Sequence, residues 1–243
     1  MRYIRVIGVV LACVLVACLA INKTIAFFTD TENVTSKFIF GDIDIVPVSG
    51  SFTDIGSKVP NQEVYNSVKV ANNSDSEAIV FVEVKVPVAT FTLVNNTEKS
   101  EVTEEVFWVK TSDITSDSLQ TKFNEQDWVL LSSTKASDYV TYLFGYNKAL
   151  GMSSVKLEDT TDITGLDALT PALFDKIQFK NYLEGTLSNN YDILVNYYGV
   201  QARYLVSDSG ESLTGSLYNE DGSLKADASL TKDTLSKIFD IIH

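Results

Sequence analysis

Few residues in this sequence have the types and spacing that chemistry at an active site requires. The only histidine, His243, is the last of the 243 residues, where fraying of a chain is expected. A zinc site or a histidine-based triad needs partner residues that the sequence lacks, and no HExxH motif or Gly-rich phosphate loop occurs. The sequence therefore predicts no catalytic residue and a protein that is not an enzyme.

Acidic side chains form several short clusters along the sequence. The clusters are Asp42 with Asp44, Glu101 with Glu104 and Glu105, Glu158 with Asp159 and Asp162, and Glu220 with Asp221. Hard oxygen ligands of this kind suit calcium. None of the clusters has the spacing of an EF-hand loop, so we interpret them as solvated turns. The sequence predicts no metal site and no cofactor, with calcium binding as the alternative.

The first 26 residues have the order of a secretory signal peptide. Arg2 and Arg5 precede an apolar run of 16 residues, 6–21, which is shorter than the roughly 20 residues that span a bilayer. The small residue Ala26 follows. We therefore expect cleavage between Ala26 and Phe27, and an exported protein that is extracellular or held at the cell surface.

The two cysteines, Cys13 and Cys18, both lie within this expected signal peptide. Cleavage after Ala26 would leave a secreted chain without any disulfide, although its compartment permits disulfides. Residues 15–18 (LVAC) also read as a lipobox, so lipidation of Cys18 is the alternative. The residues that follow Cys18 are still apolar, which favours the later cleavage site.

The composition is strongly acidic. The formal net charge is −13, and residues 1–26 hold three of the 19 basic residues and none of the 32 acidic ones. The exported part is therefore more acidic than the whole chain. Nucleic acid and anionic membranes are poor partners for such a surface.

Alternating apolar and polar residues are the main secondary-structure signal. The clearest strand is 78–88, in which Val80 and Val82 begin a valine face and Phe81 lies on the opposite face. Further strands are expected at 37–45 (with a bulge at Gly41), 64–70, 105–110, 128–132, 140–146, 177–183, 191–205 and 216–218. Many short strands separated by turn residues predict an all-β fold, an antiparallel β-sandwich or jelly roll, over residues 27–228.

Two other segments depart from this pattern. Residues 111–124 are polar, which indicates a loop or a short helix. In the last segment, 229–243, Leu235, Ile238, Phe239 and Ile242 lie on one helical face. We expect a short amphipathic helix that docks on the sandwich, with a segment that binds a partner or a surface as the alternative.

Pro87 indicates a point where its strand leaves a ladder or lies on an edge.

Tyrosines are frequent late in the chain. In the strand that follows Tyr191, Val195 and Tyr197 share one face, and Asn196 and Tyr198 share the other. A mixed aromatic and polar face suits contact with a glycan or a protein. Ordinary cross-strand pairing explains the same pattern and is the interpretation that we favour.

Residues 24–30 (TIAFFTD) and 41–45 (GDIDI) resemble the start of TasA- and camelysin-like secreted proteins of Gram-positive bacteria. Similar patches occur at 171–175, 183–185, 191–193 and 200–202. The resemblance implies a dedicated signal peptidase and a biofilm-matrix or cell-surface protein that forms fibres, alone or with other matrix proteins. In such fibres the N-terminal segment of one subunit completes the sheet of the next. Here that donor strand would span 27–36, with Phe27, Phe28 and Val34 as anchors.

Two other functions remain open from the sequence. The camelysin branch of the resembled family implies a surface metalloprotease, against which the missing histidines count. A surface module that binds glycans or host cells, lipid-anchored through Cys18, is the other alternative.

Overall fold

The computed structural model describes residues 43–49, 61, 63–95, 97–111, 120–156, 168–185 and 191–242. The strands are β1 (Ile45–Ser49), β2 (Glu63–Asn72), β3 (Ala78–Asn95), β4 (Glu98–Glu105), β5 (Phe107–Lys110), β6 (Trp128–Lys135), β7 (Tyr139–Tyr146), β8 (Phe174–Phe179), β9 (Tyr182–Gly185) and β10 (Leu194–Gln201). A 3-10 turn (Gly215–Leu217) and helix α2 (Lys232–Ile242) follow. The predicted all-β fold with a short C-terminal helix is confirmed.

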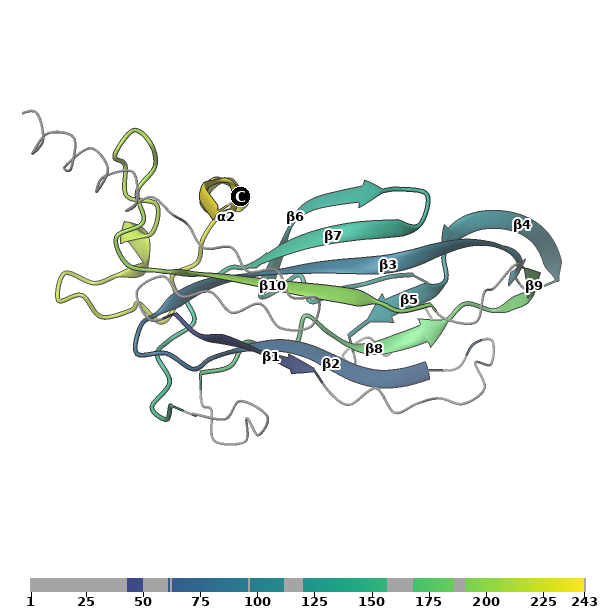
Figure 1. Ribbon diagram of the computed structural model, residues 1–243, viewed down its shortest axis with the longest axis horizontal. Helices are drawn as coiled ribbons and strands as arrows, with labels where there is room; N and C mark the ends of the chain where they lie inside the picture. Colours follow the sequence, from purple (N-terminus) through teal and green to yellow (C-terminus); the bar gives the residue numbers. More distant parts are fainter. Residues whose placement is uncertain are drawn as a thin grey trace, which may run out of the picture.

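The strands form two sheets in which the paired strands are antiparallel. One sheet has the order β1-β2-β8-β5, and the other has the order β10-β3-β7-β6, with β4 and β9 paired to β3. Figure 1 shows the first sheet beneath the second. Residues of both sheets, among them Val68, Val82 and Phe174, belong to one buried hydrophobic cluster, which we call the inter-sheet core. The finer assignment as a jelly roll remains a prediction.

The long strand β3 has two apolar faces with different partners. Val80, Val82, Val84 and Val86 are fully buried in the inter-sheet core, as the period-two pattern predicted. Ile79 and Phe81 on the opposite face are also fully buried, in a second cluster with residues of the C-terminal segment. The start of β3 is therefore covered on both faces, whereas Glu83 and Lys85 further along are partly exposed.

Pro87 marks a change of partner within β3. It is the last residue of β3 paired with β7, opposite Tyr139, and Val88 is the first paired with β4, opposite Glu105. The strand continues to Asn95, so the predicted end at residue 88 was too early. The prediction that a ladder ends near Pro87 was right for the β3–β7 pair.

Helix α2 docks on the six-stranded sheet, as its amphipathic pattern predicted. Leu235 and Ile238 are fully buried. Phe239 makes edge-on contacts with Phe81, at 5.2 Å between ring centroids, and with Tyr198, at 5.5 Å. The helix therefore closes the second hydrophobic cluster over β3 and β10.

Several predicted bounds differ from the structure. Strand β4 was missed, the predicted strand 177–183 is divided into β8 and β9, and 216–218 overlaps a 3-10 turn. Strand β1 begins at Ile45, the last residue of the predicted strand 37–45, and continues to Ser49. Residues 37–42, the expected bulge at Gly41 and residues 112–119 lie outside the described residues.

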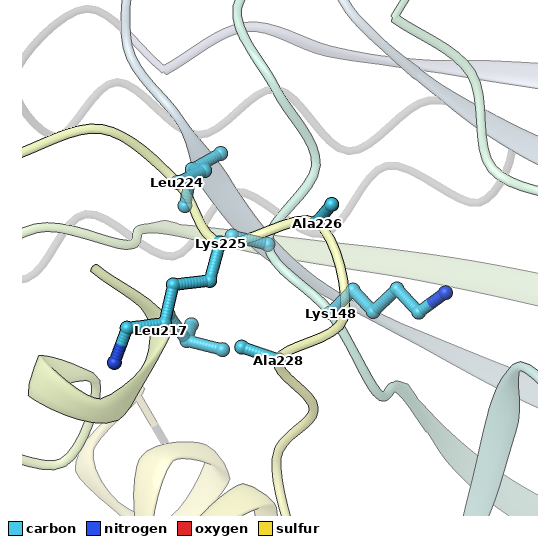
Figure 2. A pocket seen from close by; sticks show the side chains of 7 residues that line it. Lys148, Leu217, Leu224, Lys225, Ala226 and Ala228 are labelled. Atoms are coloured by element: carbon cyan, nitrogen blue, oxygen red, sulfur yellow. The ribbon is translucent and has the colours of Figure 1, made fainter. Parts of the chain in front are cut away.

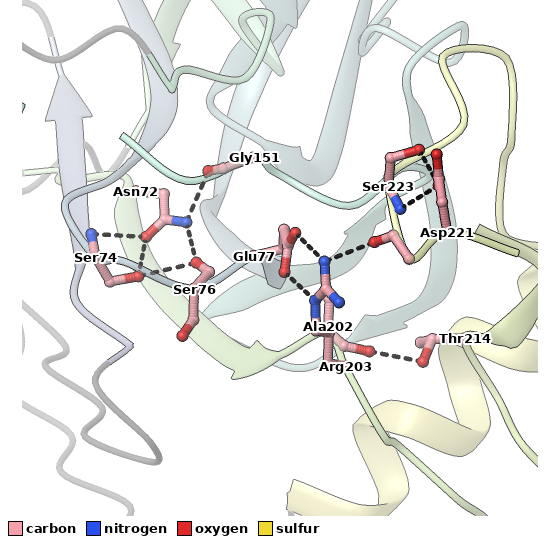
Figure 3. A network of polar contacts seen from close by, with 11 residues as sticks. Asn72, Ser74, Ser76, Glu77, Gly151, Ala202, Arg203, Thr214, Asp221 and Ser223 are labelled. Carbon is pink, nitrogen blue, oxygen red and sulfur yellow. Dashed lines mark hydrogen bonds and ion pairs between the residues drawn. The ribbon is translucent and has the colours of Figure 1, made fainter. Parts of the chain in front are cut away.

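The segment after β10 is attached to the residue before β3 by an ion pair between a buried glutamate and a partly exposed arginine (Figure 3). Arg203 donates two hydrogen bonds of 2.9 Å to the carboxylate of Glu77, whose side chain is 6% exposed. Arg203 also donates to the carbonyl oxygen of Gly222 at 2.7 Å and lies 4.9 Å from the ring centroid of Tyr218. Thr214 Oγ1 donates to the carbonyl oxygen of Ala202 at 2.6 Å. These contacts hold the C-terminal loops against the end of the sheet.

Replacement of Gly145 tests how tightly α2 is docked. A Cβ atom at Gly145 would lie 3.1 Å from Leu235 Cδ2 and 3.2 Å from Phe81 Cδ1. We expect Gly145→Ala to lower the free energy of unfolding by about 1–3 kcal/mol, because the core would be overpacked. Gly151→Ala is the matched control, since a Cβ there has no neighbour within 4 Å. Equal urea-denaturation midpoints for the two variants would contradict the packing described here.

The Glu77–Arg203 pair predicts a dependence of stability on pH. The hydrogen bond from Arg203 holds the pKa of Glu77 below its usual value of 4.5. The pair therefore stabilises the fold fully above that value, and its contribution is lost as the pH falls through the lowered pKa. We expect Glu77→Gln to cost about 1–3 kcal/mol at neutral pH and progressively less in acid. A cost that stays constant in denaturation curves from neutral to acidic pH would contradict this role.

Candidate assembly edge

The two sheets end in strands whose outer backbone groups can receive a further strand. Unpaired N–H and C=O groups on a sheet edge are a template for strand addition. The edge strands are β1 and β5 in one sheet and β10 and β6 in the other, with β4 and β9 beside the distal half of β3. Their residues decide which edge is open to another chain.

Strand β10 offers an uncharged edge of eight residues. The N–H of Ala202 donates to the carbonyl oxygen of Glu77 at 2.7 Å, which fixes the alternation of the β3–β10 ladder. Residues 194, 196, 198 and 200 consequently face β3, whereas the backbone groups of Val195, Tyr197, Gly199 and Gln201 face outward. Among the described residues no strand pairs with that outward side. The strand sequence LVNYYGVQ contains no proline and no charged residue.

Strand β1 has a blunted edge. The N–H of Asn73 donates to the carbonyl oxygen of Asp44 at 2.7 Å, so the next residue that pairs in the same way is Val46. Pro47 therefore has its nitrogen on the outward side, where it supplies no N–H. Proline on an edge strand weakens pairing with an incoming chain.

Strands β4 and β5 are protected by other features. Strand β4 (EKSEVTEE) carries five charged residues and is largely exposed, and charged edges discourage strand addition. Strand β5 has four residues, and Val109 already accepts a hydrogen bond of 2.7 Å from the N–H of Lys122. Strand β6 (WVLLSSTK) carries one charged residue, Lys135 at its end, which donates to the carbonyl oxygen of Thr103 in β4 at 2.9 Å. The longest edge without charge or proline among the four outer strands of the two sheets is therefore that of β10.

The tyrosines of β10 belong to the interior. Tyr197 is buried in the inter-sheet core, and burial raises the pKa of its hydroxyl group. Tyr198 is buried on the opposite face under Phe239, and burial raises its pKa to about 12. The predicted alternation is confirmed, and ordinary packing explains both rings. Tyr204, in the following loop, is by contrast exposed, at 87%, and has a φ of 63°.

The β10 edge lies close to β1 of the other sheet. A Cβ atom at Gly199 would lie 2.9 Å from Ile45 Cγ2, so glycine permits this close approach. A strand added to β10 would thus lie beside the blunted edge of β1. Its inward side chains would extend the inter-sheet core next to Tyr197 and Val195.

None of the sequence-predicted site residues lies within the described part of the chain. These residues are Cys18, Ala26, Phe27, Phe28 and Val34, so the cleavage site, the lipidation site and the donor strand remain predictions. Sequence reasoning missed the β10 edge. Its signal is the uncharged, proline-free run 194–201, but which strand lies at an edge depends on pairing between distant segments.

A small cavity lies apart from this edge, near the C-terminal loops (Figure 2). Its volume is about 180 Å³, and its lining residues are Lys148, Ala149, Leu217, Leu224, Lys225, Ala226 and Ala228. Lys225 Nζ donates to the carbonyl oxygen of Ser216 at 3.1 Å. The lining combines two ammonium groups with apolar side chains and contains no carboxylate, hydroxyl or imidazole group, so it assembles no acid–base pair.

Proline substitution distinguishes the two sides of β10. Gln201→Pro removes an outward N–H that makes no ladder bond, so we expect a change in unfolding free energy within about 1 kcal/mol. Association of the chain should fall at least about tenfold. Asn196→Pro is the contrasting variant, because it removes an N–H that faces β3 and a side-chain hydrogen bond of 2.8 Å to Glu83. Its cost should exceed the roughly 1–3 kcal/mol of a single lost bond. Sedimentation of Gln201→Pro indistinguishable from wild type would contradict an open edge at β10.

Within the described residues, no group of three or more His, Cys, Asp or Glu side chains could hold a metal ion. No helix in that same part of the chain is long and apolar enough to cross a membrane.

No protein-family model, curated protein or solved structure matches this sequence.

Proposed function

We propose that this protein is a secreted structural subunit of the cell surface or biofilm matrix. It assembles into filaments when the N-terminal segment of one copy, residues 27–36, pairs with the β10 edge of the next. The observation that carries the proposal is the uncharged, outward-facing backbone of Val195, Tyr197, Gly199 and Gln201. An added strand would satisfy these groups and bury alternate side chains.

Electrostatics support the same edge. The formal net charge of −13 makes two copies repel at most orientations. An edge without charge allows close approach, whereas two β4 edges would bring rows of glutamates together. Pairing at an uncharged edge such as β10 is therefore the contact that an acidic chain tolerates best, although the donor segment itself carries Asp30 and Glu32.

The geometry of such a contact favours growth. Donor and acceptor are different surfaces of one chain, so the contact is head to tail and does not close by itself. Each added subunit would present a new β10 edge to the next. A dedicated signal peptidase would release the donor segment, and other matrix proteins are proposed as further partners.

The anchors of the donor segment provide the test. Each Phe that enters the inter-sheet core contributes about 1.5–3 kcal/mol, so Phe27→Ser with Phe28→Ser should weaken filament formation by about tenfold or more. Thr31→Ser in the same segment is the matched control and should assemble normally. N-terminal sequencing and electron microscopy of the native protein should find a start at Phe27 together with filaments.

Two results would contradict the proposal. One is a native protein that starts at a lipid-modified Cys18 and forms no filaments. The other is a protein whose filaments persist when residues 27–36 are deleted.

A further inference from the structure

Strand β2 places a carboxamide in the apolar space between the two sheets. Asn66 alternates with Val64 and Val68, which both belong to the inter-sheet core. Asn66 is 2% exposed, and neither Nδ2 nor Oδ1 of its amide has a hydrogen-bond partner among the described residues. A buried polar group without a partner destabilises a fold, and such groups in native proteins need an explanation. The amide is therefore a cost to the isolated subunit.

An irregularity of the sheet lies at the same position. The register of β2 with β8 shifts between Tyr65 and Val68. Asn66 and Ser67 consequently lie opposite the single residue Asp175, as in a β-bulge. Bulges are over-represented at sheet edges and next to functional sites, where they redirect a side chain. The buried amide and the bulge thus coincide.

Asn66 lies on the side of the sandwich on which the β10 edge is open. Strand β1 pairs with β2 only as far as Val68, which is opposite Ser49. At Asn66, two residues beyond, no strand among the described residues pairs with that side of β2. Strands β1 and β10 are adjacent, because a Cβ atom at Gly199 would contact Ile45. The outer side of β2 at Asn66 and the open edge of β10 therefore border the same side of the sandwich.

Asn66 is also level with the open part of β10. The ends of β2 and β10 lie together, since Ala78, which follows the turn after β2, pairs with Gln201. Both strands extend from there toward the same end of the sandwich (Figure 1). Asn66 lies six residues before the end of β2, and Val195, which packs against the inter-sheet core, lies six residues before the end of β10. A strand added beside Val195 would thus pass close to the Asn66 amide.

The proposed donor strand has one uncharged face. In an extended strand, alternate residues of 27–36 (FFTDTENVTS) share a face. One face carries the carboxylates of Asp30 and Glu32, which an apolar core does not accept without partners. The other face is formed by Phe27, Thr29, Thr31, Asn33 and Thr35. This uncharged face would enter the space between the sheets, and its hydroxyl and amide groups would need hydrogen-bond partners there.

We propose that Asn66 sets the register of the added strand. Its amide forms a hydrogen bond with a hydroxyl or amide group on the uncharged donor face, from Thr29, Thr31 or Asn33. A register that brings only apolar side chains to this point leaves the Asn66 amide unpaired. Fixing register is the best-attested use of a buried polar residue. The inference rests on the proposed function, since it takes residues 27–36 as the strand that is added to β10.

The same residue would restrict which strands can be added. An open edge offers backbone hydrogen bonds to any extended chain. A strand with an apolar inward face would gain hydrophobic contacts beside β10, but it would leave the Asn66 amide buried without a partner. Such a penalty against competitors is a source of specificity. It favours the donor segment of this protein over more apolar strands.

Filament formation by full-length variants tests the inference. Thr29→Val, Thr31→Val and Asn33→Val together make the uncharged donor face apolar and leave the acceptor strands unchanged. Hydrophobic strand addition alone predicts stronger assembly of this triple variant. Pairing with Asn66 instead predicts a critical concentration, measured by sedimentation, that is at least about tenfold higher than that of the wild type.

Two further variants complete the test. Asn66→Leu should keep or raise the urea-denaturation midpoint of the subunit, because it removes the unpaired amide, but it should weaken assembly with the wild-type donor. Combined with the three valine substitutions, Asn66→Leu should restore assembly, because both sides of the contact are then apolar. Ser67→Ala, in the same bulge, is the matched control and should assemble normally.

Two results would overturn the inference and leave the proposed function intact. One is a triple valine variant that assembles at or below the wild-type critical concentration, a result that does not depend on whether any variant of Asn66 folds. The other is an Asn66→Leu protein that assembles like the wild type, which would assign the amide to an internal water molecule. A wild-type chain without filaments, or with filaments that persist after deletion of 27–36, would overturn the proposed function and this inference together.

Discussion

The pairing of β3 with four other strands is the interaction on which the rest of the structure depends. Its first half, from Ala78, lies between β10 and β7, and its second half pairs with β4 and β9. Its valine face fills the inter-sheet core, and Ile79 and Phe81 form the floor under α2. Both faces are thus buried at the start of this strand, so its neighbours there are fixed in register by apolar packing as well as by the ladder.

Covering both faces leaves the edges as the places where another chain can bind. Proline at position 47, the charges of β4 and the short length of β5 each protect one edge by a different device. Strand β10 has none of these devices along its eight residues, whereas β6, of equal length, carries one charge, Lys135 at its end. In a strongly acidic chain, a long edge without charge or proline is best explained by the binding of another strand. This contrast between the edges is the basis of the proposed assembly.

The sequence predicted those elements whose burial follows a regular period. The valines of β3 and the Leu235–Ile238 face of α2 are examples, because one side of each element packs on a core. Strand β4 was not predictable in this way, since it is largely exposed and has no apolar face. The β10 edge also escaped prediction. It depends on strand order, which joins residues that are far apart in the sequence.

Hydrogen exchange along β10 tests the central claim most directly. In the monomer, the outward amides of Val195 and Gln201 should exchange faster than the inward amides of Asn196 and Val200, because only the latter bond to β3. In filaments the outward amides should become protected, so the alternation should disappear. Outward amides that are already protected in the monomer, or that still exchange rapidly in filaments, would contradict strand addition at this edge.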